Sequence, residues 1–168
     1  MVENERKFVL PLDYSVPPYW KRTDIYQYYL PNGTRMRAEN DSGTARYTIC
    51  RKTPRPEGGW IENESAVTLM HFMNYNKYAT TSVMKTRFSK QYNDELWCID
   101  KYISHPEHPP YFVLAECEMP EDRDVPEHNP LTHILYQVPV SEQTQYSAKA
   151  LADVNYAIFK LKEISLGS

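Results

Sequence analysis

The chain has 168 residues, of which 24% are charged and 41% are hydrophobic, and its formal net charge is −3. This length and composition predict one globular domain over residues 1–168 and leave little room for a second core. The slightly negative charge excludes a general attraction to nucleic acid or to anionic membranes, so a site for a polyanion must come from a local cluster of basic residues.

Cysteine content and hydropathy indicate the cellular environment. The three cysteines, Cys50, Cys98 and Cys117, are widely spaced and form no CxxC pair, which predicts neither a disulfide framework nor a zinc site. No apolar run reaches membrane-spanning length, and the charged N-terminus lacks the apolar stretch of a signal peptide. We therefore expect a cytoplasmic protein with no membrane partner.

Short segments in which polar and apolar residues alternate predict strands. In chain order they are residues 3–10, 35–38, 45–52, 60–66, 82–89, 95–102 and 111–119. Two segments have helical character, 65–77 and 144–164, and apolar residues recur at helical spacing in the second. The stretches "TPRPEGG" and "PEDRDVPEHNP" predict loops. Regular strand spacing with few helices favours an α+β fold that is mainly β, with an antiparallel sheet or barrel.

Charged residues recur two positions apart in most of these strands, so they share one face of each strand. The rows are Glu3, Glu5 and Lys7; Arg35 and Arg37; Glu62 and Glu64; Lys85 and Arg87; Glu116 and Glu118; and Asp100 alone. One such row is usually a solvated surface, but same-sign neighbours on many strands cost energy unless a group of opposite charge lies between them. The repetition predicts a barrel with a charged interior and an apolar exterior.

The two kinds of row suit two kinds of ligand. Arginine and lysine bind phosphate oxygens through charge-assisted hydrogen bonds, so the basic rows predict a polyphosphate site. Paired carboxylates suit a hard divalent cation such as Mg²⁺ or Mn²⁺, which takes oxygen ligands.

The same residues resemble motifs of the CYTH, or triphosphate tunnel metalloenzyme, superfamily, which includes inorganic tripolyphosphatases, thiamine triphosphatases and class IV adenylyl cyclases. "ENERKF" resembles the ExExK signature that opens these proteins, and "QYYL" resembles their QGYL. "TRMR" is similar to their paired arginines, "ENE" and "AECE" to two ExE motifs, and "MKTRF" to a K-x-R strand. "CID" resembles a strand aspartate motif and "QYSAKALA" a C-terminal YxNKALA. The matches follow the family order along nearly the whole chain.

The resemblance implies an eight-stranded antiparallel β-barrel tunnel with a charged interior, flanked by helices that include a C-terminal one. It implies phosphate contacts from Lys7, Arg35, Arg37, Lys85, Arg87 and Lys149. It implies that Mg²⁺ or Mn²⁺ is held, directly or through water, by Glu3, Glu5, Asp100, Glu116 and Glu118. Glu62 and Glu64 would orient the basic residues or complete the metal shell.

Several positions depart from the family pattern. The third-strand lysine of the family usually follows a threonine by two positions, and "YTICRKT" has Cys50 there. We expect Lys52, one step further on the same face, to take its role. An arginine before the first ExE motif is replaced by Trp60, for which a packing role is favoured over a platform that stacks on a base or thiazole ring. The glycine of QGYL is Tyr28, and the asparagine before the C-terminal lysine is Ala148.

Two further features are expected to be structural background. His105 and His108 lie in a Pro-rich loop without further His or Cys partners, which favours solvated side chains over zinc ligands. We expect the helix at 65–77, with Val67, Met70 and Met73, to pack on the barrel wall.

Phosphoryl transfer depends on charge neutralisation and positioning more than on a covalent nucleophile. A metal-activated water, oriented by Glu3 or Glu5, would attack the terminal phosphorus while basic residues stabilise the leaving oxygens. The sequence therefore favours a metal-dependent hydrolase of triphosphate compounds, either inorganic tripolyphosphate or a nucleoside triphosphate, with Glu3, Glu5 and Lys52 as catalytic residues.

Two other functions remain open. One is a class IV-type adenylyl cyclase that makes cyclic AMP from ATP, and the other is a protein that binds a nucleotide or polyphosphate without turning it over. A nucleic-acid groove is disfavoured because the basic rows alternate with carboxylate rows. We expect a monomer or a homodimer.

Overall fold

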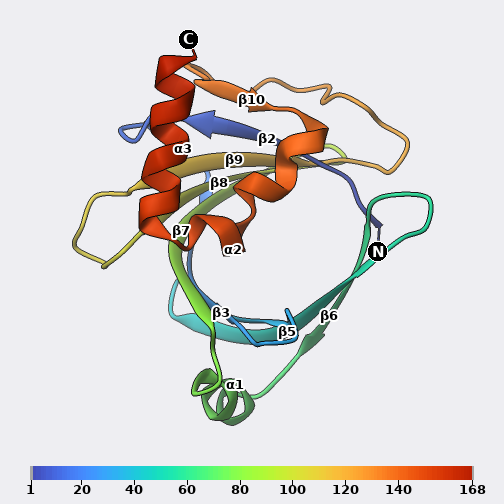
Figure 1. Ribbon diagram of the computed structural model, residues 1–168, viewed down its shortest axis with the longest axis vertical. Helices are drawn as coiled ribbons and strands as arrows, with labels where there is room; N and C mark the ends of the chain where they lie inside the picture. The colour runs from blue at the N-terminus through green and yellow to red at the C-terminus, as the bar shows by residue number, and fades with distance from the viewer. Residues whose placement is uncertain (1, 168) are drawn as a thin grey trace.

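The computed structural model of the protein describes residues 2–167 and contains one antiparallel sheet of ten strands that curls into an open half-barrel (Figure 1). The strands are β1 (Val2–Glu3), β2 (Glu5–Leu10), β3 (Lys21–Tyr29), β4 (Arg35–Asp41), β5 (Thr44–Pro54), β6 (Trp60–Ala66), β7 (Thr81–Tyr92), β8 (Glu95–Ile103), β9 (Phe112–Glu118) and β10 (Tyr136–Val138). Their order in the sheet is β1-β6-β5-β4-β3-β7-β8-β9-β2-β10. The expected eight-stranded closed barrel is therefore wrong in strand number and in closure.

The N-terminal segment accounts for part of this difference. The predicted strand at 3–10 is split at Asn4, which belongs to neither β1 nor β2. β1 pairs with β6 at one end of the sheet, whereas β2 pairs with β9 near the other end. One short segment thus bridges the two ends of the curled sheet, where a single continuous strand was expected. The short strand β10, which pairs with β2, adds a further strand that was not predicted.

Strand β3 was also not predicted, although it lies in the middle of the sheet between β4 and β7. Its residues do alternate in burial, but Thr23 and Gln27 are buried while Tyr26 on the other face is only partly covered. Since polar residues occupy buried positions, the hydrophobic alternation that marks an ordinary half-buried strand is weak here.

Two hairpins connect neighbouring strands through residues in the left-handed region. Ser42 (φ 52°) and Gly43 (φ 90°) form the two-residue turn between β4 and β5. Two consecutive positive φ values are typical of the turn whose twist matches that of paired strands. Asn93 (φ 53°) occupies a similar position between β7 and β8.

Helix α1 (Leu69–Asn76) is shorter than the helix predicted at 65–77. Strand β6 continues to Ala66, and the Thr68 side chain then accepts a hydrogen bond from the backbone N–H of His71. A threonine in this position is a helix N-cap, so the helix begins after it.

The C-terminal segment is not the continuous helix predicted at 144–164. It consists of a 3-10 helix (Val140–Tyr146), α2 (Ala148–Leu151) and α3 (Val154–Leu166). Ser147 caps α2 and Asp153 caps α3, each by accepting a hydrogen bond from a backbone N–H three residues later. Because an N-cap residue has an extended backbone, each of these two residues starts a new helix and changes the direction of the chain. No helix among residues 2–167 is long and apolar enough to cross a membrane.

The outer face of the sheet is covered by an apolar core. The rings of Phe8 and Trp97 stack with their centroids 5.6 Å apart, and loops 11–20 and 119–135 supply Trp20, Met119 and Leu131 to the same cluster. Helix α1 stands outside the curled sheet (Figure 1) and inserts Phe72 over Tyr28 and Met36. The outer face of the sheet is therefore apolar, as the sequence predicts, but loops and helix α1 cover it.

The prediction that α1 packs on the wall through Val67, Met70 and Met73 is wrong for both methionines. Met70 is 72% exposed and Met73 is 63% exposed. A helix of eight residues that contacts the sheet along one narrow stripe buries Phe72 and leaves the residues on either side in solvent.

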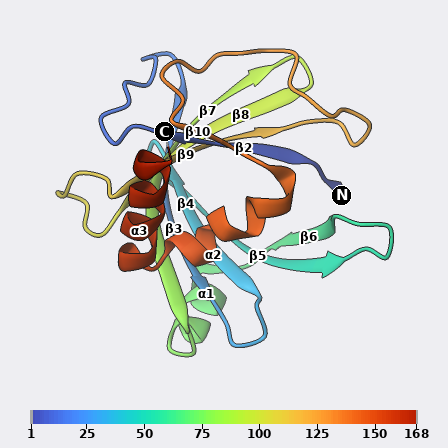
Figure 2. The same ribbon diagram turned by 45° about the horizontal axis from the view of Figure 1, so that its top comes forward.

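The C-terminal helices lie on the inner side of the curled sheet (Figures 1 and 2). Tyr146, Leu151 and Ala157 pack there against Tyr102 and other apolar residues of the sheet. This cluster covers part of the inner face, and the part that remains carries the charged residues.

Candidate active site

The strand register brings the predicted site residues to one face. Directly paired residues of neighbouring antiparallel strands project to the same side of the sheet. Pairs of this kind link the rows: Glu5 with Glu118, Lys7 with Glu116, Arg87 with Asp100, Arg35 with Cys50, Cys50 with Glu64, and Lys52 with Glu62. Lys149 comes from α2, is exposed, and has its Nζ atom 5.9 Å from the ring centroid of Tyr29 on the inner face.

A buried ion cluster lies on β7 and β8. Lys85 Nζ is 2.7 Å from Asp100 Oδ2, and Arg87 donates to both oxygens of Asp100 at 2.7 and 2.8 Å. Although burial acts in the opposite direction, Arg87 and Lys85 hold the pKa of Asp100 well below its usual range. Burial lowers the pKa of Lys85 to about 8. Asp100, predicted as a metal ligand, here orients two of the predicted phosphate-binding residues.

A second cluster joins β4, β5 and β6. The Nη2 atom of Arg35 lies 3.1 Å from Glu62 Oε1 and 3.0 Å from Glu64 Oε2. The thiol of Cys50 donates to the same Glu62 oxygen at 3.0 Å, and burial together with this hydrogen bond raises the pKa of Cys50 to about 12. Cys50 is therefore a neutral thiol that helps to hold a carboxylate, and Glu62 and Glu64 orient Arg35, one of the two roles expected for them.

Lys52 contacts a predicted metal ligand. Its Nζ atom donates to both carboxylate oxygens of Glu3, at 2.8 and 3.0 Å. Burial opposes the charged form, but Glu3 outweighs it and raises the pKa of Lys52 above its usual value. The ammonium that we expected to replace the third-strand lysine thus lies on the inner face, beside the carboxylates of the N-terminal segment.

Carboxylates crowd together where β2 meets β9. Burial and the neighbouring Glu116 raise the pKa of Glu5 to about 8, whereas Lys7 lowers the pKa of Glu116 to about 2 although burial opposes this. Lys7 Nζ lies 3.3 Å from Glu5 Oε1 and donates to the Tyr146 carbonyl at 3.2 Å. Glu5 is therefore the more readily protonated of the two carboxyl groups.

Glu118 extends this acidic region toward solvent. Burial raises its pKa, and the carboxylates of Glu62 and Glu3 raise it further. Carboxylates that raise one another's pKa in this way are held close without enough cations between them.

Two residues of the inner face were not identified from the sequence. Gln27 is fully buried, accepts a hydrogen bond from Arg37 Nε at 2.9 Å and donates to the Tyr29 hydroxyl at 2.8 Å. Burial lowers the pKa of Arg37 to about 10, so its guanidinium remains charged at neutral pH. The "QYYL" motif contains both Gln27 and Tyr29, but the spacing of the motif does not show that Gln27 contacts Arg37 and Tyr29.

The carboxylate oxygens of the inner face are chemically suited to Mg²⁺ or Mn²⁺. Burial is the main cause of the raised pKa values of Glu5 and Glu118, and repulsion from neighbouring carboxylates, which a divalent cation would reduce, adds to it. Among residues 2–167, the one trio of potential ligand atoms within 4.8 Å of one another belongs to Cys50, Glu62 and Glu64. Arg35 contacts both carboxylates of that trio and offsets one of their two negative charges. A second candidate donor set lies along β1, β2 and β9, namely Glu3, Glu5, Glu116 and Glu118, of which no three ligand atoms lie within 4.8 Å of one another.

Trp60 lies at the end of the carboxylate row of β6. It pairs with Glu3 in the β1–β6 register, so its ring projects from the inner face, and 42% of its surface is exposed. The favoured packing role is thus only partly fulfilled, and part of the Trp60 side chain is accessible.

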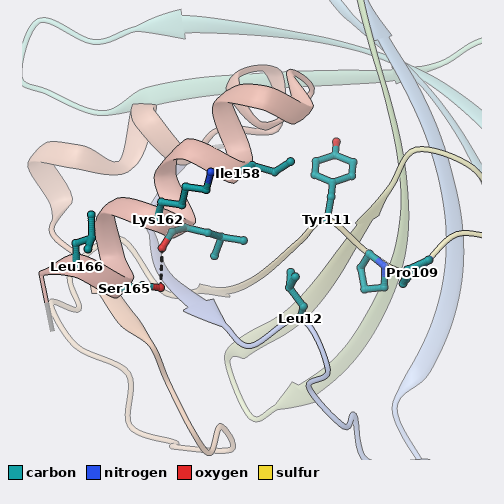
Figure 3. Close-up of a pocket in the computed structure, with 9 residues that line it drawn as sticks. Leu12, Pro109, Tyr111, Ile158, Lys162, Ser165 and Leu166 are labelled. Carbon is teal, nitrogen blue, oxygen red and sulfur yellow. Dashed lines mark hydrogen bonds between the residues drawn. The ribbon is translucent and has the colours of Figure 1, made fainter.

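A separate pocket of about 650 Å³ lies between α3 and two turns of the sheet (Figure 3). Its lining is mainly apolar, with Leu12, Tyr111 and Ile158 on different sides. None of the predicted site residues lines it, so this pocket is distinct from the charged inner face.

No family model and no curated protein matches the sequence. Solved structures do match. A hypothetical protein designated NE1496 is similar over 89% of this chain and 97% of its own, with a TM-score of 0.54 and 23% identity. The PH1819 protein from Pyrococcus horikoshii OT3 is similar over 96% and 89%, with a TM-score of 0.51 and 15% identity. A chain of the Schizosaccharomyces pombe Mediator head module is similar over 99% of this chain and 96% of its own, with a TM-score of 0.52 and 13% identity. At these identities the likeness concerns the fold.

Proposed function

We propose that the protein is a divalent-metal-dependent hydrolase of triphosphate compounds, either inorganic tripolyphosphate or a nucleoside triphosphate, and that it releases phosphate. The observation that carries this proposal is the division of the inner face into a basic region around Lys85, Arg87 and Arg37 and an acidic region around Glu5 and Glu116. A polyphosphate alone would be repelled by the acidic region, and a cation alone would be repelled by the basic one. A polyphosphate and a divalent cation bound together would complement both the basic and the acidic region.

The basic region is suited to bind the phosphates. The guanidinium of Arg87 and the ammonium of Lys85 are fixed by Asp100, and that of Arg37 is fixed by Gln27. Donors that are held in place before binding lose less side-chain entropy when a ligand arrives. The phosphate oxygens would accept hydrogen bonds from the remaining N–H groups of these three side chains, with Lys149 near Tyr29 at the edge.

The acidic region is suited to hold the metal and to move a proton. Glu3, Glu5, Glu116 and Glu118 would hold the cation, which supplies charge neutralisation for the phosphates and activates a water. Metal ligands bind in their deprotonated form, so a bound cation would displace the proton that burial and Glu116 favour on Glu5, and the Glu5 carboxylate could then accept a proton from that water. The water oxygen would bond to the terminal phosphorus, its proton would pass to a carboxylate oxygen of Glu5, and the bridging P–O bond would break to leave phosphate and a diphosphate.

Two glutamine variants test this proposal. Glu5→Gln and Glu116→Gln each replace an ionisable carboxyl group of the acidic region with a neutral amide at nearly constant volume. We expect both purified variants to remain folded by circular dichroism and to lose phosphate release from tripolyphosphate and ATP in the presence of Mg²⁺. The variant Glu107→Gln, in an exposed loop, is the matched control and should keep the wild-type rate. Wild-type rates for both site variants would refute the proposed metal site.

A second candidate is an adenylyl cyclase, in which the ribose 3′ oxygen attacks the α-phosphate of ATP. The exposed part of Trp60 favours it, because an accessible indole on the inner face offers a surface on which a base can stack. Formation of cyclic AMP and pyrophosphate from ATP by the wild-type protein, abolished in Trp60→Ala, would select this activity. Release of phosphate from ATP without cyclic AMP would exclude it.

A further inference from the structure

We propose that Asn4 is a positioning residue that sets the placement of Glu3 relative to Glu5 and thereby the affinity of the acidic region for its metal. The inference rests on the proposed function, because it assigns the two glutamates to metal binding. The side chain of Asn4 points away from the inner face, because Asn4 lies between Glu3 and Glu5, whose side chains project from that face.

Glu3 and Glu5 belong to different walls of the curled sheet. Glu3 is part of β1, which pairs with β6, and its carboxylate contacts Lys52 of β5. Glu5 is part of β2, which pairs with β9, and its carboxyl group lies beside Glu116. In a regular strand the side chains of residues 3 and 5 would follow one wall. The break at Asn4 allows the side chains of Glu3 and Glu5 to approach each other from two different walls.

Asn4 is fixed at this break by its side-chain amide and its backbone carbonyl. Its Nδ2 atom donates to the carbonyl oxygens of Pro120 and Arg123, at 2.7 and 2.8 Å. Its Oδ1 atom accepts from Arg6 Nη1 at 3.1 Å, and its backbone oxygen accepts from the N–H of Met119 at 2.9 Å. The amide orientation follows from chemistry, because carbonyl oxygens only accept and a guanidinium only donates.

The loop that receives Asn4 is itself anchored. The guanidinium of Arg123 contacts Asp94 at 2.8 Å and the buried carboxylate of Glu95 at 3.3 Å. Glu95 also accepts from the backbone N–H of His128 at 3.0 Å. Asn4 therefore clamps the N-terminal segment to a loop that cannot shift freely, and the position of the break is fixed.

Loss of the Asn4 hydrogen bonds should lower the affinity for the metal more than it lowers the stability of the fold. Groups that orient metal ligands from outside typically contribute about 10- to 100-fold in metal affinity. We expect Asn4→Ala to weaken Mn²⁺ binding, measured by electron paramagnetic resonance without substrate, by at least about 10-fold. Asn40→Ala is the matched control: Asn40 Oδ1 accepts from the Gly43 N–H at 2.9 Å in a hairpin away from the acidic region, and its variant should bind Mn²⁺ as the wild type does.

A second variant keeps the proposal testable if Asn4→Ala does not fold. Arg6→Lys removes the guanidinium that donates to Asn4 Oδ1 and to the Glu5 and Asp124 carbonyls, but leaves both Nδ2 hydrogen bonds of Asn4. It should therefore weaken Mn²⁺ binding in the same direction by a smaller factor. Thermal unfolding of each variant separates an effect on the fold from an effect on the metal.

The outcomes distinguish this inference from the proposed function. Wild-type Mn²⁺ affinity in folded Asn4→Ala, or in folded Arg6→Lys if the first variant does not fold, would overturn the role of Asn4. Mn²⁺ binding that is lost in the variant, in a protein that releases no phosphate, would support Asn4 and refute the hydrolase. Absence of Mn²⁺ binding to the wild type would overturn both.

Discussion

The ammonium of Lys85 lies 2.7 Å from Oδ2 of Asp100, and both side chains are buried. Arg87 completes the neutralisation by contacting both oxygens of the same carboxylate. One buried anion thus holds two cations on the inner face, and their position depends on it.

Replacement of Asp100 by asparagine should strongly destabilise the protein. The variant leaves two cations in the sheet without their counter-ion, and removing one partner of a buried ion pair typically costs about 3–5 kcal/mol. Urea denaturation at pH 7 measures the change in the free energy of unfolding. Asp24→Asn removes the exposed pair with Arg22 and serves as the control, with an expected cost of about 0–1 kcal/mol. Equal costs for the two variants would contradict the assignment of Asp100 as an organising anion.

Two adjacent residues, Arg51 and Lys52, allow a test of the inner face itself. Lys52 projects to the inner face and contacts Glu3, whereas Arg51 projects from the opposite face. We expect Lys52→Gln to lower the rate of phosphate release by about 100-fold, the typical loss when one stabilising donor is removed from an active site. The stability should change by less than about 1 kcal/mol, because the pair with Glu3 is partly exposed. Arg51→Gln should leave the rate unchanged, and a similar loss in both variants would contradict the assigned face.

The buried carboxylate of Glu95 predicts a pH dependence of stability. Burial acts against ionisation, but hydrogen bonds from the Glu127 and His128 backbone and from the His128 ring outweigh it and lower the pKa of Glu95 to about 2. A depressed pKa contributes stability above the unfolded-state value of 4.5, and this contribution is lost as the pH falls toward 2.

Glu95→Gln should therefore be destabilised by about 2 kcal/mol at pH 7, the typical value of hydrogen bonds to a charged group. The difference from the wild type should shrink as the pH is lowered from 5 to 3 in about unit steps, measured by urea denaturation. A difference that stays constant over this range would show that the ionised form of Glu95 contributes nothing.

Phe72, the buried residue of helix α1, should supply most of the attachment of that helix to the sheet. Phe72 is buried between Tyr28 and Tyr47, with ring centroids 5.0 and 5.3 Å away. Phe72→Ala should cost about 3–5 kcal/mol, as expected for a buried aromatic residue. Met70→Ala, on the exposed side of the same helix, should change the free energy of unfolding by less than about 0.5 kcal/mol. Thermal or urea unfolding of the two variants gives the comparison.

Much of the inner face could be predicted from the sequence because its signal is local. A two-residue repeat is enough to place Glu62 and Glu64, or Lys85 and Arg87, on one side of a strand. The strands that carry these pairs are where the alternation predicted them, apart from their bounds. The roles of the residues in binding and catalysis remain predictions.

The contacts between the rows could not be predicted, because they depend on strands that are far apart in the sequence. No local pattern shows that the Asp100 carboxylate meets Lys85 and Arg87, or that Gln27 meets Arg37. The split at Asn4 and the loss of helix continuity at Ser147 and Asp153 arise from single side chains that hydrogen-bond to the backbone. Each of these residues is also compatible with a continuous element. Asn4 interrupts its strand because it bonds to a loop that is distant in the sequence, whereas Ser147 and Asp153 interrupt the helix because each caps the helix that follows it.

The most direct test is product analysis of the wild-type protein with tripolyphosphate and ATP, in Mg²⁺ or Mn²⁺ and in chelator, resolving phosphate, pyrophosphate and cyclic AMP. The account predicts phosphate release that requires the metal and stops when the chelator is added. A folded protein that retains these compounds and forms no product in either metal would contradict it, and would make the inner face a binding site.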